Sequence, residues 1–286
     1  MYLRQITNRE AGQRLDRYLY KLLPQAGAGF LHKMLRKKNI TLNGKKAEGN
    51  EKLAAGDQIA VFFAEETLRK FMGHEPDGNP ADTTVPTSDF AAGIPLEEYH
   101  KAYKAYPDVS VIYEDSHILL ADKPAGILTQ KAAQTDLSLN EWLIGYLLNC
   151  KEITASELDT YRPSVCNRLD RNTSGIVLCA KTVQGAQLLS SLLQERTLHK
   201  YYQLYVKGVV RDSQMIEGCL SKDTRRNKVT IQLNLRPEGS GAEKESYIKT
   251  YYRPLRVETD KTLLEVELIT GKPHQIRAHL ASIGHP

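Results

Sequence analysis

The stretch "VCNRLDRNTSGIVLCAKT", residues Val165 to Thr182, joins two kinds of sequence. Its later part, "IVLCA", is a short apolar run of the kind that forms a buried strand. The residues just before it are nearly all polar, and they place one carboxylate, Asp170, between Arg168 and Arg171. We therefore predict a charged turn at the mouth of a core strand, where a ligand can reach it.

The composition is that of an ordinary globular protein. The chain has 286 residues, of which 41% are hydrophobic and 26% charged, enough for one large domain or two ordinary ones. The first ten residues, "MYLRQITNRE", contain no apolar signal core, and the longest apolar runs are too short to span a bilayer. Four cysteines without C-x-x-C spacing favour reduced thiols over a disulfide or metal site. These features predict a cytoplasmic protein without a structural metal.

The positive charge is concentrated near the N-terminus. Residues 1–73 carry 14 Lys and Arg against 7 Asp and Glu, a net charge of +7, whereas the other 213 residues carry −2. A basic small module beside a nearly neutral large one suggests a polyanionic partner, although a solvated charged face would look the same.

The first 73 residues read as helix, basic helix and hairpin. Apolar residues from Leu15 to Leu23 recur with helical spacing, a second helix is expected around 30–38, and Asn43-Gly44 signals a tight turn. This order resembles the alpha-L RNA-binding module named after a small-subunit ribosomal protein. The resemblance implies that the basic helix and the adjoining turn grip the RNA backbone through five side chains. These are Arg36, Lys37, Lys38, Lys45 and Lys46.

Residues 74–108 read as a linker, with a short helix expected near 96–103. From residue 109 onward, strand-like segments outnumber helical ones and their order is mixed. We therefore expect an α+β catalytic domain built on a mixed sheet over residues 109–286.

Asp170 does not identify an enzyme by itself. Neighbouring positive charges favour the ionised form of a carboxylate, and a structural salt bridge would need the same residues. The string "NRLDRNTSG", however, resembles the R-L-D-x-x-T-S-G signature of RluA-type pseudouridine synthases. Three further segments match that family in order: "DKPAGIL", "HKYYQLYVKG" and "LITGKPHQIRAHLASIGHP".

This resemblance implies a reaction and a catalytic residue. Enzymes of the family detach a uracil from its ribose within RNA, turn it and rejoin it through carbon 5, so no cofactor is expected. Asp170 is then the catalytic carboxylate, which either attacks the anomeric carbon or removes a sugar proton; the sequence leaves both routes open. The uridine must first leave the base stack.

Other roles follow from the same resemblance. Arg168 matches the arginine that fills the space left by the flipped base, Tyr202 the active-site tyrosine, and Arg277 the arginine that pairs with the catalytic aspartate. Further substrate-binding residues are expected in the matched segments. They are Arg171, Thr173, Lys200, Lys272, His274 and Gln275.

The sequence departs from the family pattern in three places. Asn167 stands where the family usually has a histidine, and Gly271-Lys272-Pro273 replaces a common T-G-R. The family also normally continues beyond "SIGHP", which implies a truncated C-terminal end. We expect altered contacts around Asp170 and some loss of stability rather than loss of activity.

Two other classes of protein remain open at this stage. A catalytically silent RNA-binding or ribosome-assembly protein would share the basic module, and a glycoside hydrolase would also break a glycosidic bond. The latter class generally uses two carboxylates, whereas the signature offers one. We expect large-subunit ribosomal RNA as the target, ahead of transfer RNA, and a monomer.

Overall fold

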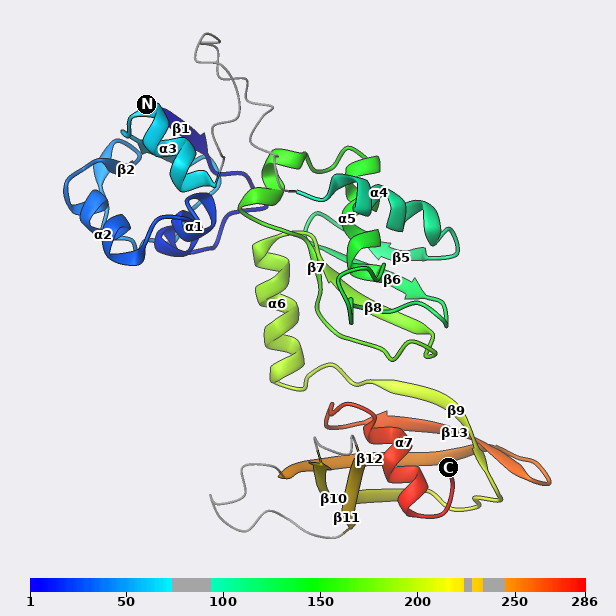
Figure 1. Cartoon of the computed structure of the whole chain (residues 1–286). Coiled ribbons are helices and arrows are strands. Elements are labelled where there is room, and N and C mark those ends of the chain that lie inside the picture. Colours follow the sequence, from blue (N-terminus) through cyan, green and yellow to red (C-terminus); the bar gives the residue numbers. More distant parts are fainter. Residues whose placement is uncertain (74–93, 224–227, 234–244) are drawn as a thin grey trace. The chain divides into compact units, whose positions relative to one another are not determined.

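The computed structural model describes residues 1–73, 94–223, 228–233 and 245–286. The chain forms two compact units, Met1–Ser191 and Leu192–Pro286, which are described separately (Figure 1). The predicted linker lies, up to residue 93, outside the described residues. Its expected helix is present as α4 (Leu96–Ala105).

The N-terminal module, which we define as residues 1–73, has the predicted order of helix, basic helix and hairpin. Its elements are β1 (Tyr2–Gln5), α1 (Leu15–Leu22), α2 (Ala28–Arg36), β2 (Ile40–Leu42), β3 (Lys45–Lys46), β4 (Gln58–Val61) and α3 (Glu65–Met72). The stripe of α1 is fully buried at Leu15, Tyr18 and Leu19, because these positions face the module's own core.

The hairpin between β2 and β3 is made by the predicted turn. Asn43 and Gly44 have φ values of 52° and 72°, the left-handed pair that a type I′ turn requires and that favours Asn-Gly. The strands form a sheet in the order β1-β4-β2-β3. The sequence analysis did not anticipate β1 or α3.

The rest of the first unit is a second small sheet with helices. Its strands are β5 (Ser110–Glu114), β6 (Ile118–Lys123), β7 (Ser164–Val165) and β8 (Gly175–Ala180), in the order β5-β6-β8-β7. The helices are α4, α5 (Leu139–Asn149), the short η2 (Ala155–Asp159) and α6 (Val183–Gln194). Gly145 lets α5 approach the backbone of α4, and Gly185 lets α6 approach the β5–β6 connection, since a Cβ at either glycine would collide with a carbonyl oxygen.

The second unit is a five-stranded sheet with one covering helix. Its elements are β9 (Tyr201–Lys207), β10 (Gln214–Asp223), β11 (Lys228–Leu233), β12 (Glu245–Val257), β13 (Lys261–Leu268) and α7 (Gln275–Ser282). The strand order is β11-β10-β12-β13-β9, and α7 lies across the sheet (Figure 1). Leu280 of α7 packs with Val206, Leu264 and Val266.

The expectation of a mixed sheet was wrong for the described residues. Every strand pair there is antiparallel. Short connections such as the turn at Asp115 can join only antiparallel neighbours, since a parallel pair needs a long crossover. The sequence also gave no warning of β10, which pairs along its length with β12.

No helix in the described parts of the chain is long and apolar enough to cross a membrane.

Candidate active site

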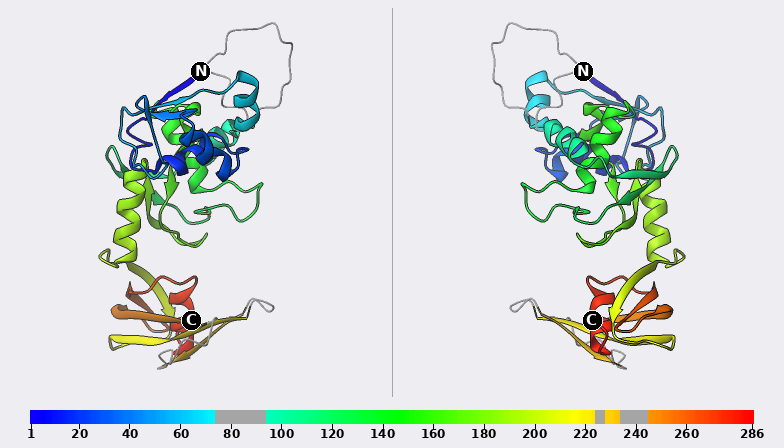
Figure 2. Two further views of the ribbon diagram at one scale, coloured as in Figure 1. Left: turned by 90° about the vertical axis from the view of Figure 1, so that its left-hand side faces the viewer. Right: turned by 90° about the vertical axis from the view of Figure 1, so that its right-hand side faces the viewer.

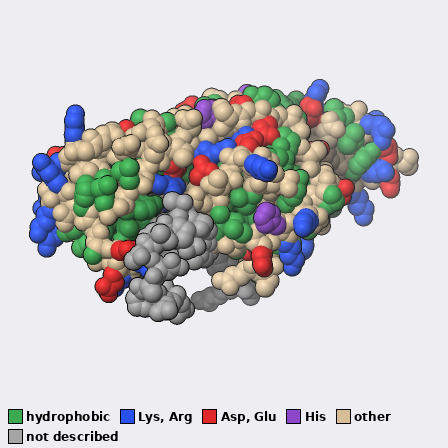
Figure 3. All heavy atoms as spheres, turned by 90° about the horizontal axis from the view of Figure 1, so that it is seen from above, with side chains coloured by type: hydrophobic (Ala, Val, Ile, Leu, Met, Phe, Trp, Pro, Cys, Tyr) green, Lys and Arg blue, Asp and Glu red, His purple; other side chains and the backbone are tan. Residues whose placement is uncertain are grey.

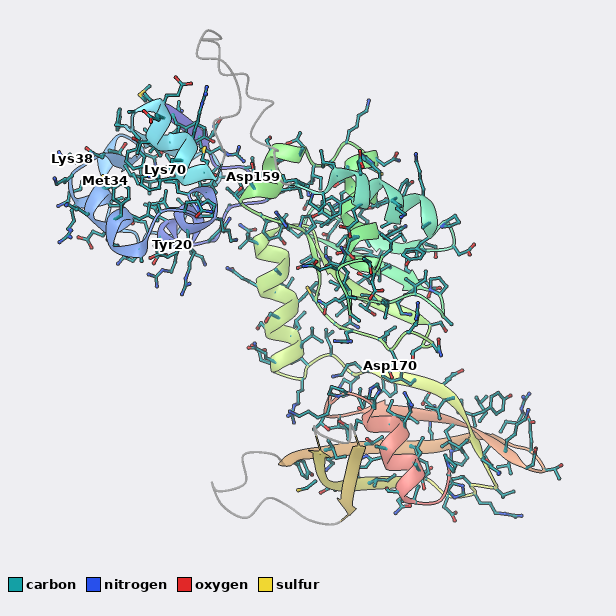
Figure 4. The ribbon with its side chains drawn as sticks, viewed as in Figure 1. Tyr20, Met34, Lys38, Lys70, Asp159 and Asp170 are labelled. Carbon is teal, nitrogen blue, oxygen red and sulfur yellow. The ribbon has the colours of Figure 1, made fainter. Side chains whose placement is uncertain are left out.

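Asp170 lies in the loop that joins β7 to β8, as the opening stretch predicts (Figure 4). Its side chain is half-buried, whereas Arg168 and Arg171 are exposed on either side of it. The backbone N–H of Thr173 donates to the carbonyl oxygen of Asp170 at 3.1 Å, which closes a turn at this point. The loop therefore presents one carboxylate flanked by two long, exposed cationic side chains.

The base of this loop is fixed to β8 by Asn167. Its Oδ1 accepts from the N–H of Leu178 at 2.7 Å, and its Nδ2 donates to the carbonyl of Ile176 at 3.3 Å. Closer to Asp170, the N–H of Leu169 donates to Oγ1 of Thr129, whose hydroxyl donates to the carbonyl of the same leucine. The side chain that departs from the family's usual histidine thus has a local structural role.

Lys123 is a residue that the sequence analysis quoted but did not single out. It is the last residue of β6 and is fully buried. Its ammonium donates to the carbonyls of Pro124, Ile127 and Arg171 at 3.0, 2.9 and 3.2 Å. Burial lowers the pKa of Lys123, and the negative charge of Asp170 opposes that shift.

The contacts of Lys123 join two loops. Arg171 O also accepts from the N–H of Gly126 at 2.8 Å, and its guanidinium Nε donates to the carbonyl of Gly126 at 3.2 Å. The segment after β6 is therefore tied to the residue next to Asp170 by backbone and side-chain bonds. A lysine directly before proline, at the end of an apolar strand, was the available signal.

Tyr202 lies in the second unit, on β9 opposite Val266 of β13. It is half-buried and, like Ile276 of α7, packs against the apolar cluster of the second unit, which includes Leu280 of that helix. Because strand side chains alternate between faces, its neighbours Tyr201 and Gln203 lie on the other face and are exposed. Tyr202 and α7 therefore share one face of this sheet.

Arg277 projects from the first turns of α7 and is exposed. One of its guanidinium nitrogens, Nη1, lies 3.4 Å from Nδ1 of His274. His274 is the N-cap residue of α7 and has a left-handed backbone with φ of 57°. These two predicted residues are thus brought together at the start of the helix.

Gln275 is buried and anchors the same helix. Its Oε1 accepts from the hydroxyl of Thr270 at 2.9 Å and from the N–H of Lys272 at 3.1 Å. Its Nε2 donates to the carbonyl of Lys249 at 3.0 Å and to Oγ1 of Thr250 at 2.9 Å. In this structure the side chain holds the start of α7 to β12, and its predicted contact with substrate stays a prediction.

His279 was quoted within a motif but not given a role. It is fully buried, and its Nδ1 lies 2.8 Å from Oγ1 of Thr250. The same oxygen accepts the hydrogen bond from Nε2 of Gln275. Burial lowers the pKa of His279 to about 4. A neutral histidine therefore helps to hold α7 against β12.

Two lysines predicted to bind substrate flank the turn after β13. Lys200 is half-buried, and burial together with the charge of Arg196 lowers its pKa. A Cβ placed at Gly271 would lie 3.6 Å from Nζ of Lys200, and the adjacent Lys272 is exposed. The structure thus gathers these residues in the second unit, whereas Asp170 belongs to the first.

The basic residues of the module lie together at the end of α2 and on the hairpin. All five predicted RNA-contacting side chains, Arg36, Lys37, Lys38, Lys45 and Lys46, are exposed. Figure 4 shows Lys38 at the outer edge of the module, where Lys and Arg side chains also project in Figure 3. Among the described residues, no group of three or more His, Cys, Asp or Glu is arranged to hold a metal ion.

Comparisons with known proteins agree with the motifs. The family model described as RNA pseudouridylate synthase matches residues 117–282. The chain is 29% identical over 278 residues to ribosomal large subunit pseudouridine synthase D of Nitrosomonas europaea, covering 96% of this chain and 67% of that protein. It is 27% identical over 277 residues to ribosomal large subunit pseudouridine synthase C of Vibrio vulnificus, covering 96% and 75%.

A solved structure shares the fold. The human protein called RNA Pseudouridylate Synthase Domain Containing 4 superimposes with a TM-score of 0.51 at 18% identity, over 65% of this chain and 68% of that one. Over the matched part of the chain, the combination of helices and antiparallel sheets is therefore one that this solved structure also has.

Proposed function

Because the chain belongs to the RNA pseudouridylate synthase family, whose members are isomerases that convert uridine in RNA to pseudouridine, we propose that it modifies specific uridines of large-subunit ribosomal RNA with Asp170 as its catalytic carboxylate. The observation that carries this proposal is the loop itself. A half-buried carboxylate is held between two exposed arginines, and the residues on both sides of it are bonded to Thr129, Lys123 and Gly126.

The isomerisation of uridine to pseudouridine requires a carboxylate held in position, and its balance requires no cofactor. The bond between C1′ of the ribose and N1 of the uracil breaks, and a bond between C1′ and C5 forms. The C5 hydrogen leaves as a proton while N1 gains one, so atoms and electrons balance within one nucleotide. A fixed carboxylate serves this reaction as nucleophile or as base, and proton transfers need only local acid–base help. We propose that the enzyme works without cofactor or metal.

We propose supporting roles for residues in both units. Tyr202 stacks on the base and assists proton transfer, Arg277 pairs with Asp170 during the reaction, and Arg168 fills the space left by the flipped uridine. The motifs that match the family support these assignments. Tyr202 is only half-buried, and the long exposed side chains of the two arginines are suited to reach charged groups.

For the N-terminal module we propose an alpha-L RNA-binding role. Its helix, basic helix and hairpin are observed, and its five exposed lysines and arginines would neutralise phosphates and release counterions. Such contacts position RNA and carry little sequence information. We retain the division into a module of residues 1–73, a linker of 74–108 and a catalytic domain of 109–286 as part of the proposal.

The target is proposed from the relatives, two of which are named for the large ribosomal subunit. We propose ribosomal RNA ahead of transfer RNA as the substrate, and a monomer as the working form. The choice of uridine would depend on RNA shape and on bases exposed in loops.

A direct experiment tests the proposal. Purified protein is incubated with unmodified large-subunit ribosomal RNA, and pseudouridine is mapped by chemical adduct formation and primer stops. We expect stops at one or a few uridines that are absent without enzyme. Binding without any new stop would favour the silent RNA-binding protein, and release of free uracil would favour a hydrolase.

A further inference from the structure

Polar contacts join the N-terminal module to the rest of the first unit at two places, near η2 and at the start of α6. Figure 1 and Figure 2 draw the ribbon of this unit without its side chains. We propose that the module is docked rather than tethered, and that Arg9 and Glu10 are positioning residues that determine which uridines are modified. By fixing the basic face of α2 relative to the Asp170 loop, they would make the enzyme select uridines by distance along the RNA. This inference rests on the proposed function.

Glu10 is the centre of the first contact. Its side chain is completely buried. Inside the module it accepts from the N–H and hydroxyl of Thr7 at 2.9 and 3.0 Å, and from Arg4 at 3.2 Å. From the other side it accepts from the hydroxyl of Thr160, which is itself buried.

This arrangement makes the contact specific. A buried carboxylate is costly unless its oxygens are hydrogen-bonded, and here one of the donors, Thr160, comes from outside the module. Arg4 crosses the same boundary, since its guanidinium donates to the carbonyl of Ser156 at 3.3 Å. Asp159, on the same short helix, is labelled beside the module in Figure 4.

Arg9 makes the second contact. Its Nη2 donates to the carbonyl of Glu152 at 2.8 Å and to the carboxylate of the same residue at 3.1 Å. Its Nη1 donates to the carbonyl of Lys181 at 3.4 Å. The backbone is also engaged, because the N–H of Val183 donates to the carbonyl of Arg9 at 3.0 Å.

Arg9 thereby joins a chain of charges inside the catalytic part. Lys181, with 3% of its side chain exposed, lies 2.7 Å from the carboxylate of Glu152 and 2.6 Å from that of Glu114. Burial alone would raise the pKa of Glu152, but hydrogen bonds from Lys181 and Arg9 hold it below the ordinary value. Partly buried, fully bonded ion pairs of this kind specify one geometry.

The position of this chain links it to the active site. Lys181 directly follows β8, and the Asp170 loop directly precedes that strand. At ~3.3 Å per residue, the six residues of β8 span about 20 Å. Arg9 is thus bonded to the residue that follows one end of β8, and the other end of this strand carries the proposed catalytic loop.

A further polar contact lies on α6. Nε2 of Gln187 on α6 donates to the carbonyl of Gly12 at 3.2 Å. Beside these contacts lies an open groove of about 1300 Å³, lined on one side by module residues such as Lys52 and on the other by residues such as His117. Loss of Arg9 or Thr160 would therefore remove hydrogen bonds from a contact that an open groove borders.

Docking has a consequence for recognition. An RNA that touches the basic end of α2 and places a uridine at Asp170 must bridge one set distance. Two linked contacts strengthen each other only when the geometry allows both at once. A released module would still attract RNA, but it would no longer favour uridines at that spacing.

The test uses the full chain with variants on both sides of the contact. Thr160→Val removes one hydroxyl from the catalytic side without changing charge, and Arg9→Ala removes the charged contact. Arg17→Ala is the matched control, because Arg17 is an exposed arginine of α1 and its loss changes the module's charge equally. Arg9→Lys retains the charge and should rescue part of the effect.

Two measurements are made on each protein. Small-angle scattering without RNA reports whether the module separates from the rest of the first unit. Steady-state kinetics compare a long ribosomal RNA fragment with a short stem-loop that carries the same uridine. For the double variant with Thr160→Val and Arg9→Ala we expect an increased radius of gyration. On the long fragment, KM should rise at least about tenfold, the equivalent of one charge-assisted hydrogen bond, with kcat unchanged.

On the short stem-loop the double variant should match wild type, and Arg17→Ala should match wild type in scattering. New modification at other uridines of the long fragment would support selection by distance. An unchanged radius of gyration in the double variant would overturn docking through these residues. An increased radius with unchanged KM and site choice would overturn their role in selection. If wild type modifies no RNA, the proposed function fails together with that role, while scattering still decides whether the module is docked.

Discussion

Replacing Lys123 with methionine removes a buried ammonium while keeping an apolar side chain of similar length. The residue is fully buried at the end of β6, and its Nζ donates to three carbonyl oxygens, those of Pro124, Ile127 and Arg171. The third of these belongs to the residue beside Asp170. The substitution therefore tests whether a buried charge organises the proposed catalytic loop.

The expected loss of stability follows from these three bonds. A buried acceptor left without its partner costs about 1–3 kcal/mol. Two of the three bonds are only partly buried, and removal of the ammonium also relieves its desolvation, so we take the lower end, about 1 kcal/mol for each carbonyl. The total of about 3 kcal/mol should lower the melting temperature by roughly 6–12 °C.

Scanning calorimetry measures the loss, and hydrogen exchange locates it. The N–H of Gly126, which donates to the carbonyl of Arg171, should exchange faster in the variant. Lys104→Met is the control, since Lys104 is an exposed residue of α4. Turnover should fall because the Asp170 loop loses a support. If Lys123→Met melted and exchanged like Lys104→Met, the buried ammonium would not be what holds the two loops together.

Three further predictions concern other parts of the chain. Burial lowers the pKa of His279 from 6.5 to about 4. Above pH ~6.5 the histidine is neutral in both the folded and the unfolded chain and does not lower the free energy of unfolding. As the pH drops toward 4, protonation of the unfolded chain should lower this free energy by up to about 3 kcal/mol. His279→Gln, followed by denaturant unfolding across this range, should lack that acid limb, and an unchanged limb would contradict the assignment. Deleting residues 1–73 removes a charge of +7; filter binding should show weaker affinity for ribosomal RNA and a flatter salt dependence, while a short stem-loop at high concentration is still modified. Complete inactivity of a folded truncation would refute this division of labour. Arg277→Met should reduce turnover steeply, with the residual activity rising with pH, and Arg277→Lys should lie between the two. A near wild-type rate with a flat pH profile in Arg277→Met would show that Arg277 does not act with Asp170.

The local elements were predictable because their signals are local. The apolar stripe from Leu15 to Leu23 gave α1, and the left-handed preference of Asn43-Gly44 gave the hairpin turn. The strand that follows Asp170 was read correctly from "IVLCA". By contrast, β10 has no clean alternation and obtains its structure by pairing with β12, which the sequence does not display.

The bonded environment of the site was not predictable in the same way. Lys and Glu are usually exposed and His is intermediate, yet Lys123, Glu10 and His279 are all fully buried here. Their burial depends on partners far away in the chain, such as Arg171 for the lysine and Thr160 for the glutamate. Only the folded arrangement shows that these polar groups hold segments together. Motif matching found the loop around Asp170, but the partners of its neighbours had to come from the structure.

The central claim is that Asp170 performs the chemistry, and Asp170→Asn tests it most directly. The amide keeps the shape of the side chain and removes the charge. The variant and wild type are compared by mapping pseudouridine in large-subunit ribosomal RNA and by filter binding to the same RNA, with Asp108→Asn, an exposed acid before β5, as control. We predict that Asp170→Asn forms no pseudouridine while its RNA affinity matches wild type. Turnover within about tenfold of wild type, the range in which a positioned acid or base would be dispensable, would contradict the account.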